Sequence, residues 1–333
     1  MDIQVAVTRA PPGGPRAVLE ASAQSLQRDA AAVLALVMAT EGSTYVRPGA
    51  MALFGIDTGQ IGWLSGGCLE PEIERRARHA ATTTRMSWLD IDTRDDEDLF
   101  SGSALGCRGR LRLALLPLAG LPRWDELVGA WRRADAPLCI AITGDGNMHA
   151  RVGALEHRWQ VECMNPDDVQ PGPWEVAIPA PPTVAIFGAG PETPALVPAL
   201  RNLGWIVTLI EQRPRWAPLA ADADVAIEQS PQVALAALSG RRFDAALVMH
   251  HNFELDREAL ATLAASSTSR IGFIGLLGPA RRREDLFRVL PDEARESLAP
   301  RLHSPVGMNL GGHGPEAIAL SIAAQLHAFR HSP

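Results

Sequence analysis

One cysteine follows directly on a glycine turn in the first half of the chain. In "SGGCLE" the turn contains Gly66 and Gly67, the cysteine is Cys68, and a helix is expected to begin near Glu70. The N-terminus of a helix favours negative charge, so it would favour the thiolate form of this side chain. An exposed thiolate is suited to soft, thiol-reactive chemistry. The residues alone leave ordinary packing as an equal alternative for Cys68.

Two other loops in the same half carry residues of a similar kind. The run "EGSTYVRPGAM" contains Ser43, Thr44 and Arg47, and "SGSALGCRGRL" places Cys107 directly before Arg108. A neighbouring guanidinium favours a thiolate. Two thiols in such surroundings, on two glycine loops, are more than packing usually supplies. The three loops together therefore indicate a site rather than a scaffold.

The four cysteines form no familiar metal or disulfide pattern. They lie far apart, without a Cys-x-x-Cys pair or a zinc spacing. Cys139 and Cys163 stand in strand-like runs and are expected to be unreactive. Cysteines used in this way are typical of a reducing compartment, and the sequence has neither a signal-peptide pattern nor a run of about 18 apolar residues. We therefore expect a cytoplasmic protein without a membrane span.

Charge and composition argue against a nucleic-acid-binding protein. The chain of 333 residues has 31 basic and 38 acidic residues, which gives a net charge of −7. Non-specific nucleic-acid binding needs a basic surface, so no nucleic-acid partner is expected. The hydrophobic content of 47% predicts a globular protein, and the length predicts two domains.

A second glycine loop opens the second half. The run "FGAGPET" follows an apolar strand and leads into a helix, which is the context of a phosphate-binding loop. Gly188 would allow the tight turn and Gly190 the approach of a pyrophosphate, although Pro191 lacks an amide donor and Thr193 replaces the third glycine. Glu211 ends the next strand, where an acid would meet a ribose hydroxyl. The alternatives are a bound nucleotide-like or pterin-like ligand and a loop that binds nothing.

Two adjacent histidines follow a later strand of this half. In "VMHHNFELD", His250 and His251 stand at the carboxyl end of the strand, where open parallel sheets bind ligands. Successive side chains point to opposite faces, so one histidine can face a ligand while the other packs. We take His250 as the candidate. Together with the glycine loop, it leaves open an NAD(P)-dependent oxidoreductase as the alternative function.

Five prolines between residues 171 and 182 mark the expected domain boundary. Proline interrupts helices and central strands. We place the boundary near residue 181, which gives domains at 1–180 and 181–333.

The elements of the two domains follow different patterns. The second alternates apolar strands with helices, which predicts an α/β fold: a Rossmann-like, doubly wound parallel sheet. Its strands are expected at 183–188, 205–210, 224–227, 243–249 and 270–275, and its helices at 193–204, 231–240, 256–267, 279–290 and 315–330. The first domain has more strands than helices, so an α+β fold is expected. Its strands are expected at 31–40, 50–56, 60–65, 85–91, 110–118, 137–143 and 174–178, with a hairpin over 148–163 and helices at 70–80 and 122–134.

Together, these segments resemble the XdhC/CoxI family, which comprises accessory proteins of molybdenum hydroxylases such as xanthine dehydrogenase. The resemblance runs in the family's order from about residue 31 to residue 328. Besides the loops above, it includes "GWLSGGCLEPEI", "ALVMHHNFELDREAL", "IGFIGLLGPARRREDL" and "LHSPVGMNLGGHGPEAIALSIAAQL". The chain differs from the family pattern at Tyr45, where proline is usual, and at Pro191, where histidine is frequent.

The resemblance implies an XdhC/CoxI domain followed by a Rossmann-like domain. The implied activity is to bind the molybdenum cofactor (molybdopterin), protect its sulfurated form and deliver it to an apo molybdoenzyme of the xanthine dehydrogenase type. The chain would thus be a chaperone more than a catalyst, and a homodimer, with a cysteine desulfurase as a further partner. Cys68 would be the candidate metal ligand, held as a thiolate beside the metal or its exchangeable sulfur. The residues expected to bind the cofactor, or a nucleotide in the second domain, are Cys68, Cys107, Gly66, Gly67, Ser43, Thr44, Arg47, Gly188, Gly190, Glu211 and His250.

Overall fold

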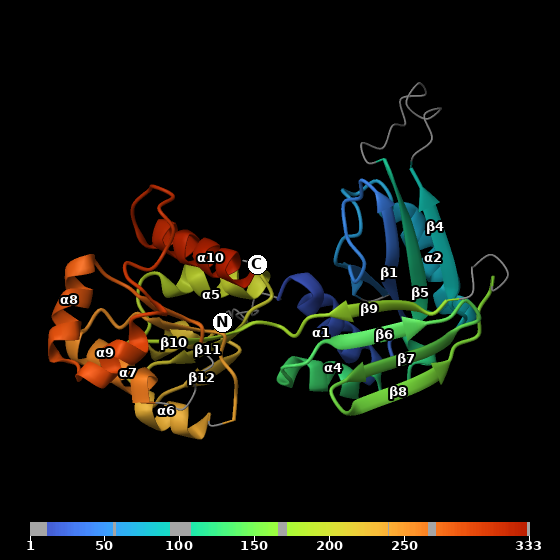
Figure 1. The fold of residues 1–333 in the computed structure, drawn as a ribbon. Coiled ribbons are helices and arrows are strands. Elements are labelled where there is room, and N and C mark those ends of the chain that lie inside the picture. The colour runs from blue at the N-terminus through green and yellow to red at the C-terminus, as the bar shows by residue number, and fades with distance from the viewer. Residues whose placement is uncertain are drawn as a thin grey trace, which may run out of the picture. The chain divides into compact units, whose positions relative to one another are not determined.

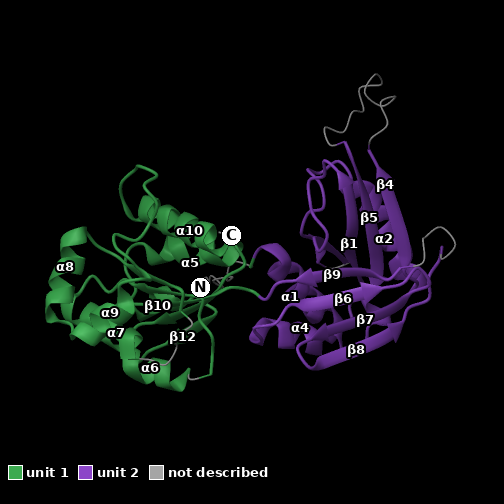
Figure 2. Ribbon diagram, in the orientation of Figure 1, with its two compact units in different colours: residues 1–12, 181–333 green, residues 13–180 purple. Residues whose placement is uncertain are grey.

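The computed structural model describes residues 12–55, 58–93, 108–165, 172–238, 240–265 and 271–331. The chain forms two compact units, an N-terminal unit at Gly13–Ala180 and a C-terminal unit built mainly from Pro181–Pro333 (Figure 1 and Figure 2). The division falls within the proline-rich stretch of the sequence. Among the helices in the described ranges, none is long and apolar enough to cross a membrane.

The N-terminal unit contains a five-stranded antiparallel sheet with the strand order β3-β2-β1-β5-β4. Its strands are β1 (Ala32–Gly42), β2 (Met51–Gly55), β3 (Gly59–Ile61), β4 (Ser87–Asp92) and β5 (Gly109–Pro117). The first seven residues of β1 are buried, which explains why their sequence is apolar without alternation. Helix α2 (Glu70–Thr83) covers one face of the sheet, with Ile73, Ala77 and Ala80 in the shared core.

The opposite face packs against a second sheet and two helices. Leu34 and Leu36 of β1 point to this side because side chains alternate along a strand. The second sheet is antiparallel with the order β8-β7-β6-β9, and its core includes the fully buried Trp124 and Trp131. The elements are α1 (Gly14–Gln27), η1 (Leu118–Gly120), α4 (Trp124–Arg133), β6 (Leu138–Ile142), β7 (Asn147–Val152), β8 (Leu155–Gln160) and β9 (Trp174–Ile178).

Two elements of this unit differ from the sequence prediction. The strand expected over 60–65 ends at Ile61, because Gly62 has a φ of +89° and an added Cβ there would lie 2.6 Å from the Met51 carbonyl oxygen. The chain bends there and forms a loop that leads to α2. Helix α1 was not predicted, since prolines and glycines surround its start; a proline is tolerated in the first turn, where the amide has no helical partner.

The C-terminal unit contains a six-stranded parallel sheet with the order β12-β11-β10-β13-β14-β15. Its strands are β10 (Thr183–Phe187), β11 (Ile206–Ile210), β12 (Val225–Ile227), β13 (Ala245–Val248), β14 (Phe273–Leu276) and β15 (Leu302–His303). The helices are α5 (Thr193–Asn202), η3 (Ala217–Ala220), α6 (Pro231–Ala237), α7 (Phe253–Ala265), α8 (Ala280–Val289), α9 (Asp292–Leu298) and α10 (Pro315–His331). The predicted Rossmann-like fold is confirmed, while β15 and α9 were not predicted.

Helices cover both faces of this sheet. One core contains the apolar side chains of α5 and α10, and the other contains those of α6, α7, α8 and α9 (Figure 1). From β10 the chain proceeds outward to β11 and β12, and then returns to β13 on the other side of β10. The carboxyl ends of β10 and β13 therefore form the topological switch point, where open α/β sheets bind ligands.

Candidate functional site

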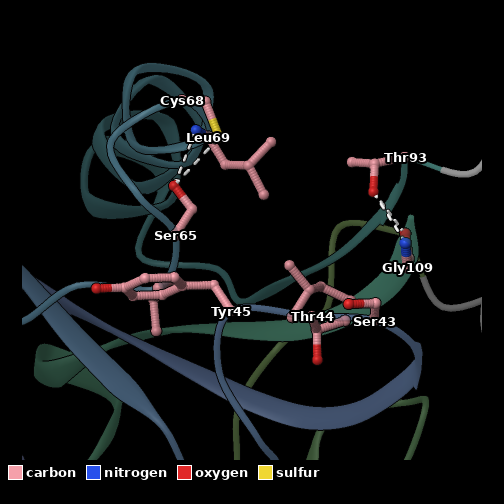
Figure 3. Close-up of a pocket in the computed structure, with 10 residues that line it drawn as sticks. Ser43, Thr44, Tyr45, Ser65, Cys68, Leu69, Thr93 and Gly109 are labelled. Carbon is pink, nitrogen blue, oxygen red and sulfur yellow. Dashed lines mark hydrogen bonds between the residues drawn. The ribbon is translucent and has the colours of Figure 1, made fainter. Parts of the chain in front are cut away.

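A pocket in the N-terminal unit brings together two of the loops that the sequence indicated. Cys68 reaches it from the loop before α2, and Ser43 and Thr44 reach it from the loop after β1. Figure 3 shows Cys68 and Ser65 on one side and Ser43, Thr44 and Tyr45 on the other. The lining residues are Ser43, Thr44, Tyr45, Leu64, Ser65, Cys68, Leu69, Thr93, Gly109 and Leu111.

The glycine turn leaves the cysteine accessible. Gly67 has a φ of +104°, a conformation that suits glycine, and an added Cβ at Gly66 or Gly67 would meet no atom within 4 Å. Cys68 is exposed, whereas Cys163 is buried and Cys139 is half-buried in β6. The sequence signal for an accessible thiol was the glycine pair, because glycines without side chains do not cover their neighbour.

A buried carboxylate organises the loop around the thiol. Glu70 is 5% exposed, and its Oε1 accepts hydrogen bonds from the amides of Leu64 at 3.0 Å and Ser65 at 2.8 Å. Its Oε2 accepts a hydrogen bond from the Ser65 hydroxyl. Burial raises the pKa of Glu70, but the hydrogen bonds from Ser65 and Leu64 outweigh it and hold the pKa below its usual value. Glu70 is therefore ionised at neutral pH, and its hydrogen bonds hold this loop in place.

The hydrogen bonds of Ser65 determine whether its hydroxyl can donate a hydrogen bond to the Cys68 thiol. The Ser65 hydroxyl donates to Glu70, and its oxygen accepts from the amides of Gly67 and Leu69, each at 3.1 Å. A hydroxyl has one proton and two acceptor positions, so all three are occupied. Cys68 Sγ lies 3.6 Å from this oxygen. The thiol is the donor in this weak contact, and its sulfur receives no proton from Ser65.

The far side of the pocket is held by the start of β5. Thr93 Oγ1 donates to the Gly109 carbonyl at 2.8 Å and accepts from the Gly109 amide at 3.1 Å. An added Cβ at Gly109 would lie 2.5 Å from both the Ser43 carbonyl oxygen and a methyl carbon of Thr44. Only glycine allows the loop after β1 to lie this close to β5.

Three predicted and described residues of this unit, Gly66, Gly67 and Arg47, are not among the lining residues. Arg47 is exposed in the loop after β1, where its carbonyl accepts from the Ala50 amide at 3.0 Å. Cys107 lies outside the described residues, while the neighbouring Arg108 is exposed. Sequence reasoning missed Ser65, Glu70 and Thr93, although the acid at the first position of a helix that follows a glycine turn was a visible signal for Glu70.

The donor set around Cys68 is small. Within the described ranges, no group of three or more His, Cys, Asp or Glu side chains is placed to hold a metal ion. Zinc and other ions bound by protein alone commonly need three or four such ligands. Among the described residues, Cys68 therefore does not belong to such a ligand set.

The glycine loop of the C-terminal unit is closed by internal hydrogen bonds. Gly188 has a φ of +91°, and an added Cβ there would lie 2.6 Å from the Cα of His250. The Ala189 amide donates to Glu211 Oε2 at 2.7 Å, and the Gly190 amide donates to Thr193 Oγ1 at 2.9 Å. Both amides are therefore used within the chain rather than presented to a phosphate.

Glu211 is buried and fully engaged. Its exposed fraction is 1%, and besides Ala189 its oxygens accept from the amide of Arg213 at 2.7 Å and from the Arg213 guanidinium at 2.9 and 2.6 Å. Burial raises the pKa of Glu211, but the hydrogen bonds from Arg213 and Ala189 outweigh it and keep the pKa below its usual value. The expected contact of Glu211 with a ribose stays a prediction, and a ribose would have to compete with these partners.

The two histidines after β13 lie in different environments. His250 is 2% exposed and its Nδ1 lies 3.1 Å from Asp256 Oδ1, whereas the His251 side chain is 47% exposed and its Nε2 lies 3.1 Å from Glu192 Oε2. Arg282 forms an ion pair with the other oxygen of Asp256. Sequence reasoning missed Arg213 and Asp256, and it did not connect Arg282 with Asp256, from which it is 26 residues distant.

Comparison with known protein families gives two matches along this chain. Residues 25–92 match the XdhC and CoxI family, and residues 184–326 match the XdhC Rossmann domain. The first match includes Cys68 and the loop after β1, and the second includes the glycine loop and both histidines after β13.

Individual proteins are similar over most of the chain. A curated relative from Bacillus subtilis (strain 168), named as a probable xanthine dehydrogenase subunit, is 26% identical over 328 residues, which cover 89% of this chain and 92% of the relative. A crystal structure of a xanthine dehydrogenase from Bacillus halodurans is 27% identical with a TM-score of 0.77, over 95% of this chain and 96% of that one. A shorter match, 40% identical over 73 residues, covers 21% of this chain and 13% of the Escherichia coli (strain K12) "Uncharacterized protein YqeB". With both of its units matched, the chain belongs to the XdhC and CoxI family.

Proposed function

We propose that this chain is an accessory protein of a xanthine dehydrogenase-type molybdenum hydroxylase, and that it binds, protects and delivers the molybdenum cofactor. Membership of the XdhC and CoxI family supports the accessory role, and the names of the similar proteins from the two Bacillus species support the link to xanthine dehydrogenase. The single observation that carries the proposal is the pocket in which an exposed thiol lies among hydroxyl groups.

The chemistry of the pocket fits this cofactor. The molybdenum cofactor brings two dithiolene sulfurs to its metal, so it needs few ligands from the protein. Cys68 offers one soft sulfur, and no cluster of metal-binding side chains lies within the described residues. A bare metal ion would be held poorly by such a site. The pocket is thus suited to a metal that arrives with its own ligands.

Each part of the pocket has a role in the proposal. Cys68 holds the metal or lies next to its exchangeable sulfur, and the Ser43 hydroxyl bonds the polar edge of the pterin. The Thr44 hydroxyl donates to the Val46 carbonyl at 2.7 Å, so it serves the pterin as an acceptor. The open space at Gly66 and Gly67 lets the ligand approach the backbone. Arg47, exposed on the loop after β1, and Cys107 remain candidates for contacts with the phosphate and with the metal centre.

Delivery requires partners. The receiving partner is an apo molybdenum hydroxylase, and a cysteine desulfurase is the proposed source of the cofactor's exchangeable sulfur. We further propose that the chain acts in the cytoplasm as a homodimer. No observation favours the alternative of an NAD(P)-dependent oxidoreductase, since the amides of Ala189 and Gly190 are used within the chain.

The test measures pterin that is carried by the purified full-length protein. The protein is denatured, the extract is oxidised, and the fluorescent pterin derivative is quantified. Wild type is expected to release pterin, and Cys68→Ser to release little while unfolding at the wild-type temperature. Cys139→Ser, a half-buried thiol outside the pocket, serves as the matched control and should retain the cofactor. Equal pterin in Cys68→Ser and wild type would show that the assignment is wrong.

A further inference from the structure

The last turn of helix α10 carries two exposed histidines. His327 and His331 are four residues apart, and residues at this spacing lie next to each other on the same face of a helix. Their ring centroids are 4.6 Å apart, and the ring planes are inclined by 57°. The two imidazoles are therefore adjacent and open to solvent.

The opposite side of this turn is anchored in the core of the C-terminal unit. Leu326 is fully buried, and the ring of Phe329 packs against that of Phe273 in β14 with 5.3 Å between the centroids. Figure 1 shows α10 beside α5, with which it shares this core. Because the apolar side of the turn is held by packing, the spacing of the two histidines is fixed before any ligand arrives.

The two imidazoles have each other as neighbours and no other polar partner in the described part of the chain. Other histidines of the protein are paired with an acid, such as His149 with Glu156 at 3.1 Å. Burial lowers the pKa of His331, and so do the neighbouring His327 and Arg330. The His331 imidazole is therefore mainly neutral at pH 7, and a neutral imidazole has a nitrogen lone pair that can bind a metal.

The geometry of the pair suits two cis ligands of one metal ion. A metal that is bound at right angles by two imidazoles, with bonds of about 2.0–2.1 Å, has the two ring centres roughly 4–5 Å apart. The observed separation of 4.6 Å lies in this range. Two histidines at i and i+4 on a helix are also the spacing with which helical metalloproteases hold zinc. His331 is the last residue of α10, and the C-terminal end of a helix attracts positive charge.

We propose that His327 and His331 chelate a divalent transition metal ion of the class that prefers imidazole, such as Ni²⁺, Zn²⁺ or Cu²⁺. One nitrogen of each ring replaces a water molecule of the hydrated ion, and the other positions of the ion keep water. Two ligands are fewer than the three or four of a structural metal centre, so the pair is a surface chelate that exchanges its ion with solvent. An ion bound to both residues ties together the last turn of α10. The site involves neither Cys68 nor the proposed function.

Titration of the full-length protein with NiCl₂ at pH 8 tests the proposal by calorimetry. His327→Gln and His331→Gln are each expected to weaken the binding about tenfold or more, because the remaining imidazole loses its chelating neighbour. The double variant should bind no more weakly than either single variant, since one ion is shared. Mg²⁺ should not bind, because it prefers oxygen ligands.

His79→Gln is the matched control. His79 is an exposed histidine on helix α2, with Arg75 and Thr83 at the positions four residues away, and its replacement should leave the affinity unchanged. Cys68→Ser should also leave it unchanged. Two independent sites, of which each single variant keeps one at wild-type affinity, would overturn the proposal, and so would an equal loss in His79→Gln.

Wild type supplies a readout that does not depend on a variant. Ni²⁺ is paramagnetic, so in ¹H–¹⁵N spectra of histidine-labelled protein a substoichiometric amount should broaden the ring signals of His327 and His331 before those of the other histidines. Amide hydrogen exchange in the last turn of α10 should slow when Ni²⁺ is added, because the ion bridges that turn. Broadening of His79 at the same Ni²⁺ concentration, or unchanged exchange in the turn at saturation, would contradict the inference.

Discussion

The Ser65 hydroxyl donates its proton to the buried carboxylate of Glu70 and not to the thiol three residues further on. Two backbone amides of the glycine turn donate to the same hydroxyl oxygen. The carboxylate, the hydroxyl and the turn thus form one hydrogen-bonded unit, and Cys68 lies on its outer side. The shape of the loop, and with it the position of the sulfur, depends on Glu70 remaining ionised.

Glu70→Gln is therefore expected to destabilise the protein in a pH-dependent way. Three donors converge on the carboxylate, whereas the amide of glutamine has one acceptor oxygen, so a loss of about 1–3 kcal/mol is expected at pH 7. Because the folded-state pKa of Glu70 lies below its unfolded value, the stabilisation is complete above the usual glutamate pKa of about 4.3 and is lost as the pH falls through the folded value. The check is the difference in unfolding temperature between variant and wild type at neutral and at acidic pH.

Glu72→Gln is the matched control for this prediction. Glu72 belongs to the same helical turn but is 44% exposed and pairs with Arg75 and Arg76 on the surface, where such pairs contribute less than about 1 kcal/mol. A difference for Glu70→Gln that stays constant down to acidic pH would contradict the role of its charge.

The accessibility of the thiols predicts an order of alkylation. Cys68 is exposed, Cys139 is half-buried and Cys163 is 7% exposed, so iodoacetamide at neutral pH should label Cys68 faster than the other two. Peptide mass spectrometry after increasing reaction times measures the three rates separately. Finding Cys68 slower than Cys163 would be incompatible with the described position of the glycine turn.

The two glycines before Cys68 should differ in their tolerance of alanine. Neither would bring a Cβ within 4 Å of another atom, but only Gly67 has a positive φ, of +104°. Gly67→Ala should therefore cost about 1–2 kcal/mol of backbone strain, and Gly66→Ala little. Thermal unfolding of the two variants measures this difference. Equal stability of both would show that the turn does not need a left-handed residue.

At the switch point of the C-terminal unit, we expect steric contact rather than backbone φ to determine how much an alanine substitution destabilises the protein. Gly188 and Gly240 both have positive φ, +91° and +94°, yet only at Gly188 would a Cβ meet other atoms, those of His250 at 2.6 Å. Gly240→Ala is expected to cost about 1–2 kcal/mol through strain alone. Gly188→Ala should cost about 3 kcal/mol or more, because the end of β13 must also move. Denaturant unfolding tests this, and a smaller loss for Gly188→Ala than for Gly240→Ala would refute it.

The fold of the C-terminal unit was predictable because its strands are apolar and its helices begin and end at glycine and proline signals. The first unit was harder. Helix α1 begins among prolines and glycines, and Gly62 ends a strand that its apolar neighbours suggested would continue to Ser65. That glycine acts through its contact with the Met51 carbonyl, which belongs to the neighbouring strand and is invisible in a local pattern.

The candidate sites show the same division between local and distant information. Cys68, Ser43 and Thr44 were found because each stands in a glycine-rich or hydroxyl-rich loop, and they line one pocket. Asp256 was missed, and Arg282 was not connected with it, because their bond joins helices α7 and α8 and arises only when both pack on the sheet. The sequence indicated that one of the two adjacent histidines could pack, and the structure identifies it as His250, which contacts Asp256 six residues on and lies against Gly188.

The small donor set around Cys68 has a consequence for metal selectivity in the cell. Free zinc and copper ions bind most strongly where several thiolates and imidazoles converge. The described residues form no such group. Under the proposed function, a pocket with few protein donors would favour molybdenum that arrives with its pterin over these free ions. Under the proposed function, few protein–metal bonds would then have to be exchanged when the cofactor passes to the receiving enzyme.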